Sequence, residues 1–247
     1  MASETVRLLS GGQPATRDGS GSMVTVVWRG CNGFGPTKGI LAEVAFWHND
    51  QRHGPVTRWS TDAVLSEQGV YRFGARHGRW VVWNKNGRPY QATDYLADQR
   101  HGQFYEWHAN GSKAYAGTYH RDLEDGLWQA WYDNGARRWS GHLSEGKRSG
   151  RWQRWHDNGA LWTLGDYVAG KKYGDWRMLA RGGEIVEEGS FLADERHGPW
   201  TFWYKNGNKR LEGMYVHGHR QGIWSAWDET GEAQAPKVYP QSAGGSE

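Results

Sequence analysis

Four histidines stand at the same position of a sequence pattern that recurs every 24 residues, and imidazole is a common zinc ligand. They are His53, His77, His101 and His197. In an array of stacked β-hairpins, equivalent residues lie about 9–10 Å apart, because each hairpin adds two strand spacings. Histidines this far apart cannot share one ion, so the spacing predicts no metal site. We expect these rings to pack over a neighbouring ring or to hydrogen-bond a turn.

A basic residue precedes the histidine position in seven of the eight repeats. These residues form the basic column, which consists of Arg52, Arg76, Arg100, Arg148, Lys172, Arg196 and Arg220. Such a file of cations attracts anions, so phospholipid headgroups, nucleic acid and acidic proteins are candidate partners. The alternative is that these are solvated charges that protect the sheet edges, partly cancelled by acids such as Asp98 and Glu124. The net charge of +3 is too small to argue for nucleic acid.

Tryptophan recurs in two columns that lie three positions apart within each repeat. The first column consists of Trp80, Trp128, Trp152, Trp176, Trp200 and Trp224, with Phe104 in the third repeat. The second column consists of Trp59, Trp83, Trp107, Trp131, Trp155, Trp203 and Trp227, with Leu179 in the sixth. Residues three apart on a regular strand point to opposite faces, so we expect one column to be buried and the other partly exposed. A β-bulge would reverse this parity, so the sequence leaves open which column is which.

An exposed tryptophan column is a stacking platform for sugar rings, bases or the aliphatic side chains of a partner. The second column is therefore the candidate partner-binding surface. The alternative is that its rings pack across the strands and only stabilise the array.

Catalytic residues are not indicated. Cys31 is the only cysteine, and no motif places it beside His48 or His53. No glycine-rich loop opens a helix, as phosphate binding by such loops requires. The sequence therefore predicts a protein that is not an enzyme and has no cofactor. A single cysteine excludes an internal disulfide and favours a reducing, cytoplasmic location.

The element that positions these columns is the repeat itself, which eight glycines mark at intervals of 24 residues. They are Gly54, Gly78, Gly102, Gly126, Gly150, Gly174, Gly198 and Gly222. A strand-like run such as Trp80-Val81-Val82-Trp83 follows the glycine, and an Asn-Gly pair then predicts a hairpin turn, because both residues tolerate a positive φ. A second strand carries a glycine and an aromatic residue two positions apart, so that the glycine leaves space beside a ring. A fixed period of this length indicates an all-β, elongated single-layer solenoid of about eight β-hairpins.

The repeats divide the chain into four segments. Residues 1–22 form a flexible N-terminal segment, residues 23–52 a degenerate capping repeat, residues 53–232 the array, and residues 233–247 a mostly disordered tail. The first and sixth repeats depart most from the pattern, with Val56 in place of the first tryptophan and Leu179 in place of the second. We expect a partner to bind at these two repeats.

Length and composition agree with a thin array. The apolar fraction of the 247 residues is 37%, and burial depends on 17 Trp and 12 Tyr. No apolar run is long enough to span a bilayer, and the N-terminus does not resemble a secretory signal.

The pattern resembles the MORN repeat, in the bacterial variant often described as antitoxin-like. The segments that carry the resemblance are Gly117-Thr118-Tyr119, Gly165-Asp166-Tyr167, Gly189-Ser190-Phe191, Gly213-Met214-Tyr215, Arg76-His77-Gly78, Arg100-His101-Gly102 and Arg196-His197-Gly198. It covers about four fifths of the chain. It implies a β-hairpin solenoid with scaffolding or binding roles, sometimes at membranes. The array also resembles, less closely, the Trp-rich hairpin repeats of cell-wall-binding modules.

The expected function is recognition of a protein partner through the Trp-lined and basic faces, as an antitoxin or assembly factor. A peripheral module that binds anionic phospholipid and a carbohydrate-binding module are the alternatives. Open sheet edges also permit a homodimer.

Overall fold

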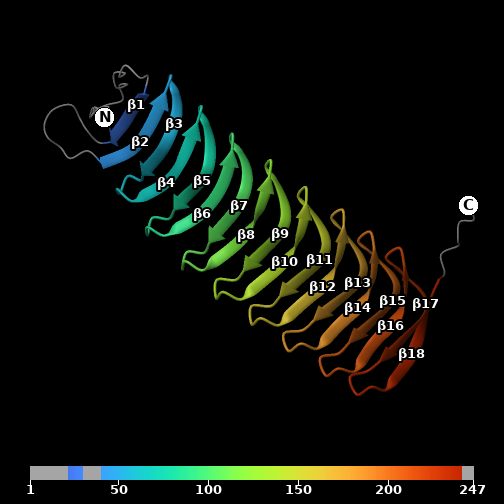
Figure 1. Cartoon of the computed structure of the whole chain (residues 1–247). Helices are drawn as coiled ribbons and strands as arrows, with labels where there is room; N and C mark the ends of the chain where they lie inside the picture. Colours follow the sequence, from blue (N-terminus) through green and yellow to red (C-terminus); the bar gives the residue numbers. More distant parts are fainter. Residues whose placement is uncertain (1–21, 30–39, 241–247) are drawn as a thin grey trace, which may run out of the picture. The chain divides into compact units, whose positions relative to one another are not determined.

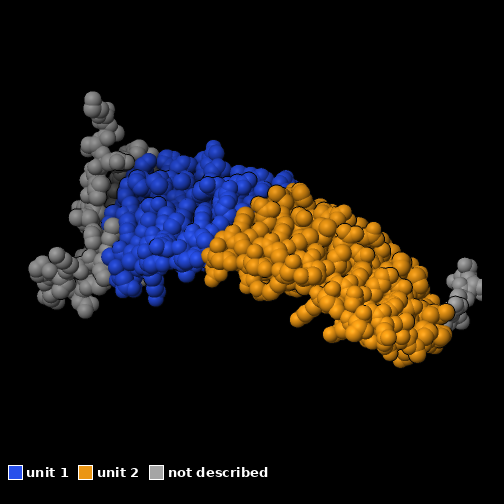
Figure 2. All heavy atoms as spheres, turned by 90° about the horizontal axis from the view of Figure 1, so that it is seen from below, with its two compact units in different colours: residues 1–123 blue, residues 124–247 orange. Residues whose placement is uncertain are grey.

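The computed structural model describes residues 22–29 and 40–240. Cys31, residues 1–21 of the expected flexible segment and the end of the expected tail lie outside these residues. The chain forms two compact units, residues 1–123 and residues 124–247 (Figure 2). We call them unit 1 and unit 2.

The described residues of unit 1 form eight strands. They are β1 (Ser22–Arg29), β2 (Ile40–His48), β3 (Gln51–Trp59), β4 (Leu65–Arg72), β5 (Ala75–Trp83), β6 (Pro89–Leu96), β7 (Gln99–Trp107) and β8 (Lys113–His120). Each strand pairs antiparallel with the next one in the chain, from β1 with β2 to β7 with β8.

Unit 2 repeats the arrangement. Its strands are β9 (Leu123–Trp131), which begins at the last residue of unit 1, β10 (Arg137–Ser144), β11 (Lys147–Trp155), β12 (Leu161–Val168), β13 (Lys171–Leu179), β14 (Ile185–Leu192), β15 (Glu195–Trp203), β16 (Lys209–Val216), β17 (His219–Trp227) and β18 (Ala233–Tyr239). Sequential strands again pair antiparallel, from β9 with β10 to β17 with β18. Within each unit the strands follow one another in chain order, and the described residues contain no helix (Figure 1). The predicted all-β array of hairpins is confirmed.

The expected Asn-Gly turns form, but only the glycine of the pair adopts the positive φ that both residues tolerate. Gly87 has a φ of 74°, whereas Asn86 does not have a positive φ. The Gly87 N–H donates to the Asn84 carbonyl, and the Asn86 side-chain oxygen accepts the Arg88 N–H at 3.1 Å. Asparagine therefore contributes as a side-chain acceptor that closes the turn, and only glycine supplies the left-handed backbone.

The two-residue turns with positive φ lie at the other end of each hairpin, where the sequence predicted a polar return loop. Phe73-Gly74 and Ala97-Asp98 are examples, and both residues of each pair have a positive φ. This geometry is that of a type I′ turn, whose twist matches that of paired strands. Consecutive strands are therefore joined by tight turns at both ends of the strands.

The glycines that recur every 24 residues all have positive φ, for example 67° at Gly78 and 79° at Gly198. Each lies where the register of its strand shifts against the preceding strand, as between Gln68 and Val70 opposite Gly78. A Cβ at Gly78 or Gly198 would meet no atom within 4 Å. At these two positions the backbone conformation of a β-bulge, and not lack of space, is therefore why glycine stands there.

The other repeated glycine, in the Gly-x-Tyr segments, is required for the opposite reason. A Cβ on Gly189 would lie 2.3 Å from Cδ2 of Trp200, and one on Gly165 would lie 2.1 Å from Cδ2 of Trp176. These glycines have no positive φ. The expectation that this glycine leaves space for a ring is confirmed, and we call it the ring-contact position.

Where the ring is smaller, the ring-contact residue is larger. Thr93 lies opposite Phe104, and Ala45 lies opposite Val56. Both pairs are buried. The first and third repeats thus keep a filled core without a tryptophan in the first column.

The C-terminal region differs from the expected tail. Residues 233–239 form β18, because Tyr239 continues the aromatic column and its ring centroid lies 6.2 Å from that of Trp224. The Tyr239 hydroxyl also accepts a hydrogen bond from Arg220 at 3.0 Å.

Candidate functional site

The first tryptophan column is buried and defines what we call the aromatic face of the sheet. Trp200 is 2% exposed and Trp176 is 8% exposed. The Trp200 indole N–H donates to the Ser190 carbonyl at 2.9 Å, and Tyr215 packs edge-on against this ring at a centroid distance of 6.0 Å. This column is therefore the core of the array.

The second tryptophan column lies on the opposite face, because the strand between the two columns alternates regularly. The extra residue of the nearby bulge is on the partner strand, where Trp83 pairs with Pro89. All seven tryptophans of this column are half-buried. Arg137 lies 5.3 Å from the ring centroid of Trp155, and the Tyr132 hydroxyl donates to the Trp155 carbonyl at 2.9 Å. The rings are thus partly covered by the neighbouring repeat.

The basic column lies on the aromatic face, above the buried rings. Arg196 is 4.4 Å from the ring centroid of Trp200, Arg100 is 4.1 Å from that of Tyr119, and Lys172 is 4.8 Å from that of Trp176. Cations at these distances are attracted by the negative face of an aromatic ring. The column therefore extends the core as a layer of cations.

Most members of the basic column also have an anionic or hydroxyl partner. Carboxylates pair with four of them, in the pairs Arg52–Glu43, Arg76–Asp98, Arg100–Asp122 and Arg196–Glu187. Tyrosine hydroxyls accept from Arg148 and Arg220. Hydrogen bonds from the Arg100 backbone and side chain hold the pKa of Asp122 below its usual value. The cations of these repeats are therefore already engaged within the chain.

The two predicted binding columns are thus on different faces of the sheet, and the structure does not bring them together. The histidine column takes the structural role that we expected at His53. Its Nδ1 accepts the Phe73 N–H at 3.3 Å, and its ring packs against Phe73 at 4.9 Å. No group of three or more potential metal ligands occurs in the described residues.

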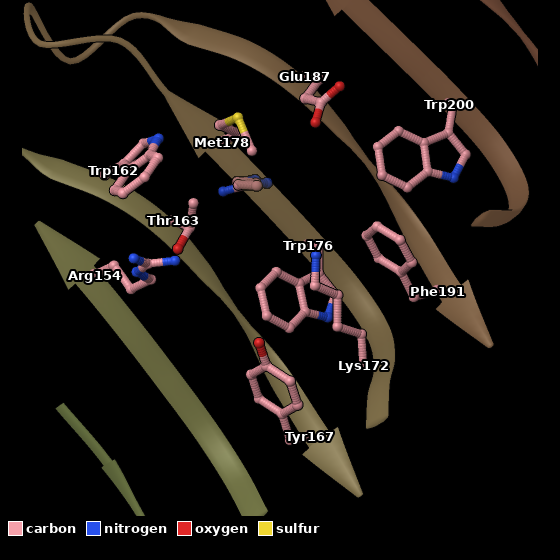
Figure 3. A pocket seen from close by; sticks show the side chains of 11 residues that line it. Arg154, Trp162, Thr163, Tyr167, Lys172, Trp176, Met178, Glu187, Phe191 and Trp200 are labelled. Atoms are coloured by element: carbon pink, nitrogen blue, oxygen red, sulfur yellow. The ribbon is translucent and has the colours of Figure 1, made fainter. Parts of the chain in front are cut away.

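A hollow opens on the aromatic face of unit 2, between the fifth and seventh repeats (Figure 3). Its volume is about 110 Å³. The side chains around it come from five successive strands, β11 to β15, and include Arg154, Trp162, Thr163, Lys172, Met178 and Trp200. A second hollow of about 70 Å³ shares Arg154, Thr163, Tyr167 and Trp176 with the first, so the two adjoin.

The hollow exists because Thr163 is small. Thr163 pairs with Arg154 on one side and with Met178 on the other. At the equivalent position one repeat earlier, Trp139 fills the space and stacks on Trp152 at 5.2 Å. Figure 3 shows Thr163 beside Arg154, with Trp162 and Met178 also close to it.

Three cations border this hollow, namely Arg154, Lys172 and Arg177, and the last of them pairs with Glu188 at 2.9 Å. The other two contact aromatic rings. Lys172 lies 4.6 Å from the ring centroid of Phe191, and Arg154 lies 4.6 Å from that of Trp162. In the described part of the chain, neither side chain forms an ion pair. Burial lowers the pKa of Lys172, although the charges of Asp194 and Glu187 oppose this effect. The hollow therefore combines apolar walls with two cations that form no ion pair among the described residues, although Lys172 feels the charges of Asp194 and Glu187.

Sequence reasoning identified Lys172 but not Arg154, Thr163 or Met178. The available signal was the irregularity of the sixth repeat, to which Met178 belongs. The first repeat is irregular as well, because its first column lacks the tryptophan. There, however, Ala45 and Val56 fill the core together.

Comparison with known families and proteins gives limited matches. Residues 196–217 match the family described as MORN repeat variant, which supports the MORN-repeat family. This segment covers all of β15 except its first residue and the whole of β16, one hairpin of unit 2. A search of curated proteins found no match. The described residues include no helix of the length and apolarity needed to cross a bilayer.

Proposed function

We propose that this chain is a non-enzymatic, cytoplasmic binding or scaffold protein that recognises a protein partner on the aromatic face of unit 2. The repeat fold and the MORN repeat match support a binding or scaffold role. The observation that carries the position of the site is the hollow around Thr163, where aromatic walls and two cations without ion-pair partners meet.

The remaining surfaces argue less for recognition. The basic column is stacked on rings and largely paired, so it does not offer a continuous row of free charges to a membrane. The second tryptophan column is partly covered by neighbouring repeats. Neutralisation of a toxin or assistance in assembly is consistent with a scaffold of this kind, and we propose one of these as its cellular task.

Site-specific photo-crosslinking tests the position of the site. The photoreactive residue p-benzoylphenylalanine is placed at Trp162, which borders the hollow, and in a matched variant at Tyr173, which is exposed on the opposite face. We expect one discrete protein to crosslink in native lysate from position 162 and not from position 173. Equal labelling from both positions, or none from either, would contradict the proposal.

A further inference from the structure

Two ion pairs between glutamate and arginine hold a carboxylate beside the basic column. In three repeats the position nine residues before the cation is a glutamate, and in two of them the two side chains pair. Glu43 accepts from Arg52 at 2.9 Å, and Glu187 accepts from Arg196 at 2.8 Å. Both glutamates are mostly buried, with side chains 16% and 18% exposed.

Unit 1 contains a second version of this contact. Arg58 pairs with Glu67, nine residues later, and with Glu43 at 2.7 Å. Although burial opposes it, hydrogen bonds to Glu43, Tyr71 and Glu67 raise the pKa of Arg58 above its usual value. A carboxylate between two such cations is therefore a stable arrangement in this fold.

Thr163 stands at this carboxylate position in unit 2. It lies nine residues after Arg154 and nine before Lys172, and these correspond to Arg58 and Arg76 of unit 1. The two cations are kept, while the carboxylate is replaced by a shorter, neutral side chain. The hollow occupies the space that a glutamate side chain would fill.

We propose that this hollow binds a glutamate or aspartate side chain of a protein partner, whose carboxylate pairs with Arg154 and Lys172. The inference rests on the proposed function, because it names the chemistry of the partner at the same site. The apolar surfaces of Trp162, Met178 and Trp176 contact the methylene groups of the acidic side chain. A volume of about 110 Å³ is large enough for one such side chain.

Charge complementarity selects this occupant. Glu187 is the carboxylate among the residues around the hollow, and it is already paired with Arg196. A carboxylate that enters the hollow accepts charge-assisted hydrogen bonds from Lys172, which is half-buried, and from Arg154, which is exposed. An alkyl or aromatic side chain accepts no hydrogen bond from either cation, and a basic one is repelled.

The test uses N-acetylglutamate α-amide as the probe and N-acetylglutamine amide as its neutral isostere. Binding to the full chain is followed by NMR through the indole N–H of Trp176 and the methyl group of Met178. We expect saturable shifts with the glutamate probe and shifts weaker by about tenfold or more with the glutamine probe. Equal responses to both probes, or no response to either, would overturn the inference.

Three variants locate the site. Thr163→Glu supplies the carboxylate from the chain itself, so we expect it to abolish probe binding without lowering the unfolding midpoint. Arg154→Met and Lys172→Met each remove one cation and should weaken binding about tenfold. Arg151→Met, on the opposite face, is the matched control and should bind as the wild type. Retained binding in Thr163→Glu would place the probe elsewhere and refute the assignment.

The two proposals fail separately. Crosslinking from position 162 that persists in Thr163→Glu, together with no probe binding, leaves a protein site that does not recognise a carboxylate. Probe binding without any crosslinked protein leaves a carboxylate site without the proposed function. Displacement of the probe by phosphatidylglycerol vesicles but not by a glutamate-containing peptide would assign the site to lipid and overturn the protein occupant.

Discussion

The Trp200 indole lies directly against the backbone of Gly189, with Cδ2 only 2.3 Å from the place where a Cβ would stand. The two residues are register partners on β14 and β15. The same close contact joins Gly165 to Trp176 and Gly213 to Trp224. Each of these seams is therefore built by a ring that packs on bare backbone.

Gly189→Ala should destabilise unit 2 by about 1–3 kcal/mol, because the added methyl group overpacks a buried ring. Trp200→Phe in the same chain should recover part of this loss, since Thr93 tolerates Phe104 in the third repeat. Urea unfolding of the two single variants and the double variant measures the coupling between the sites. If the losses in unfolding free energy of the two single variants simply add in the double variant, the contact between Gly189 and Trp200 does not determine which residue types stand at these positions.

Ala63 occupies the turn position that glycine holds in other repeats, with a φ of 58°. The left-handed conformation costs a non-glycine residue about 1–2 kcal/mol. Ala63→Gly should therefore stabilise unit 1, by less than about 1 kcal/mol after the entropic cost of glycine. The matched change Gly87→Ala, at a φ of 74°, should act in the opposite direction. Amide exchange at the two turns reports both changes in stability. If the two substitutions change the stability in the same direction, the explanation is wrong.

Arg196 should contribute more stability than Arg79, although both pair with a carboxylate. Arg196 also stacks on Trp200, and its partner Glu187 is 18% exposed. Arg196→Gln leaves that carboxylate without its charged donor and should cost about 1–3 kcal/mol. Arg79 is 51% exposed in its pair with Asp94, so Arg79→Gln should cost no more than about 1 kcal/mol. Urea midpoints of the two variants, measured at low and high salt, test this order.

Asp122 should titrate below the ordinary value of 3.8, because the Arg100 backbone and side chain donate to its carboxylate. A carboxyl group whose pKa is lower in the folded state than in the unfolded state stabilises the fold at pH values above its unfolded-state pKa. This stabilisation is lost as the pH falls through its folded-state pKa. Carboxyl NMR of Asp122 should show the low pKa in the wild type and a higher one in Arg100→Gln. An unchanged pKa in this variant would show that the Arg100 side chain does not lower it and would leave the backbone hydrogen bond as the cause.

The sequence predicted the hairpins, because 24-residue periodicity and Asn-Gly pairs report local backbone geometry that recurs in every repeat. It also placed the two tryptophan columns on opposite faces, although only the structure shows that the first is buried. The parity was ambiguous because bulges occur in every hairpin. Opposing side chains on paired strands decide it, and their register is not visible in one sequence.

The candidate site was predicted only in part. Lys172 belonged to a repeated column, so its position stood out. Arg154 and Thr163 occupy positions that hold different residue types in other repeats, among them Glu106 and Trp139 at the equivalent places. Their significance arises from a missing side chain between two cations, and a gap of this kind appears only when the neighbours are placed in space.

The matched sizes of ring and ring-contact residue restrict how such an array changes length during evolution. Unequal recombination joins the upstream part of one repeat to the downstream part of another. A crossover between Thr93 and the residue equivalent to Phe104 would place threonine beneath a tryptophan, where glycines such as Gly189 leave no room for a Cβ. Crossovers elsewhere in the repeat keep each ring with its own contact residue. Duplication and loss of repeats are therefore expected to have their endpoints outside this interval, so that the inherited module runs from one ring to the next ring-contact position.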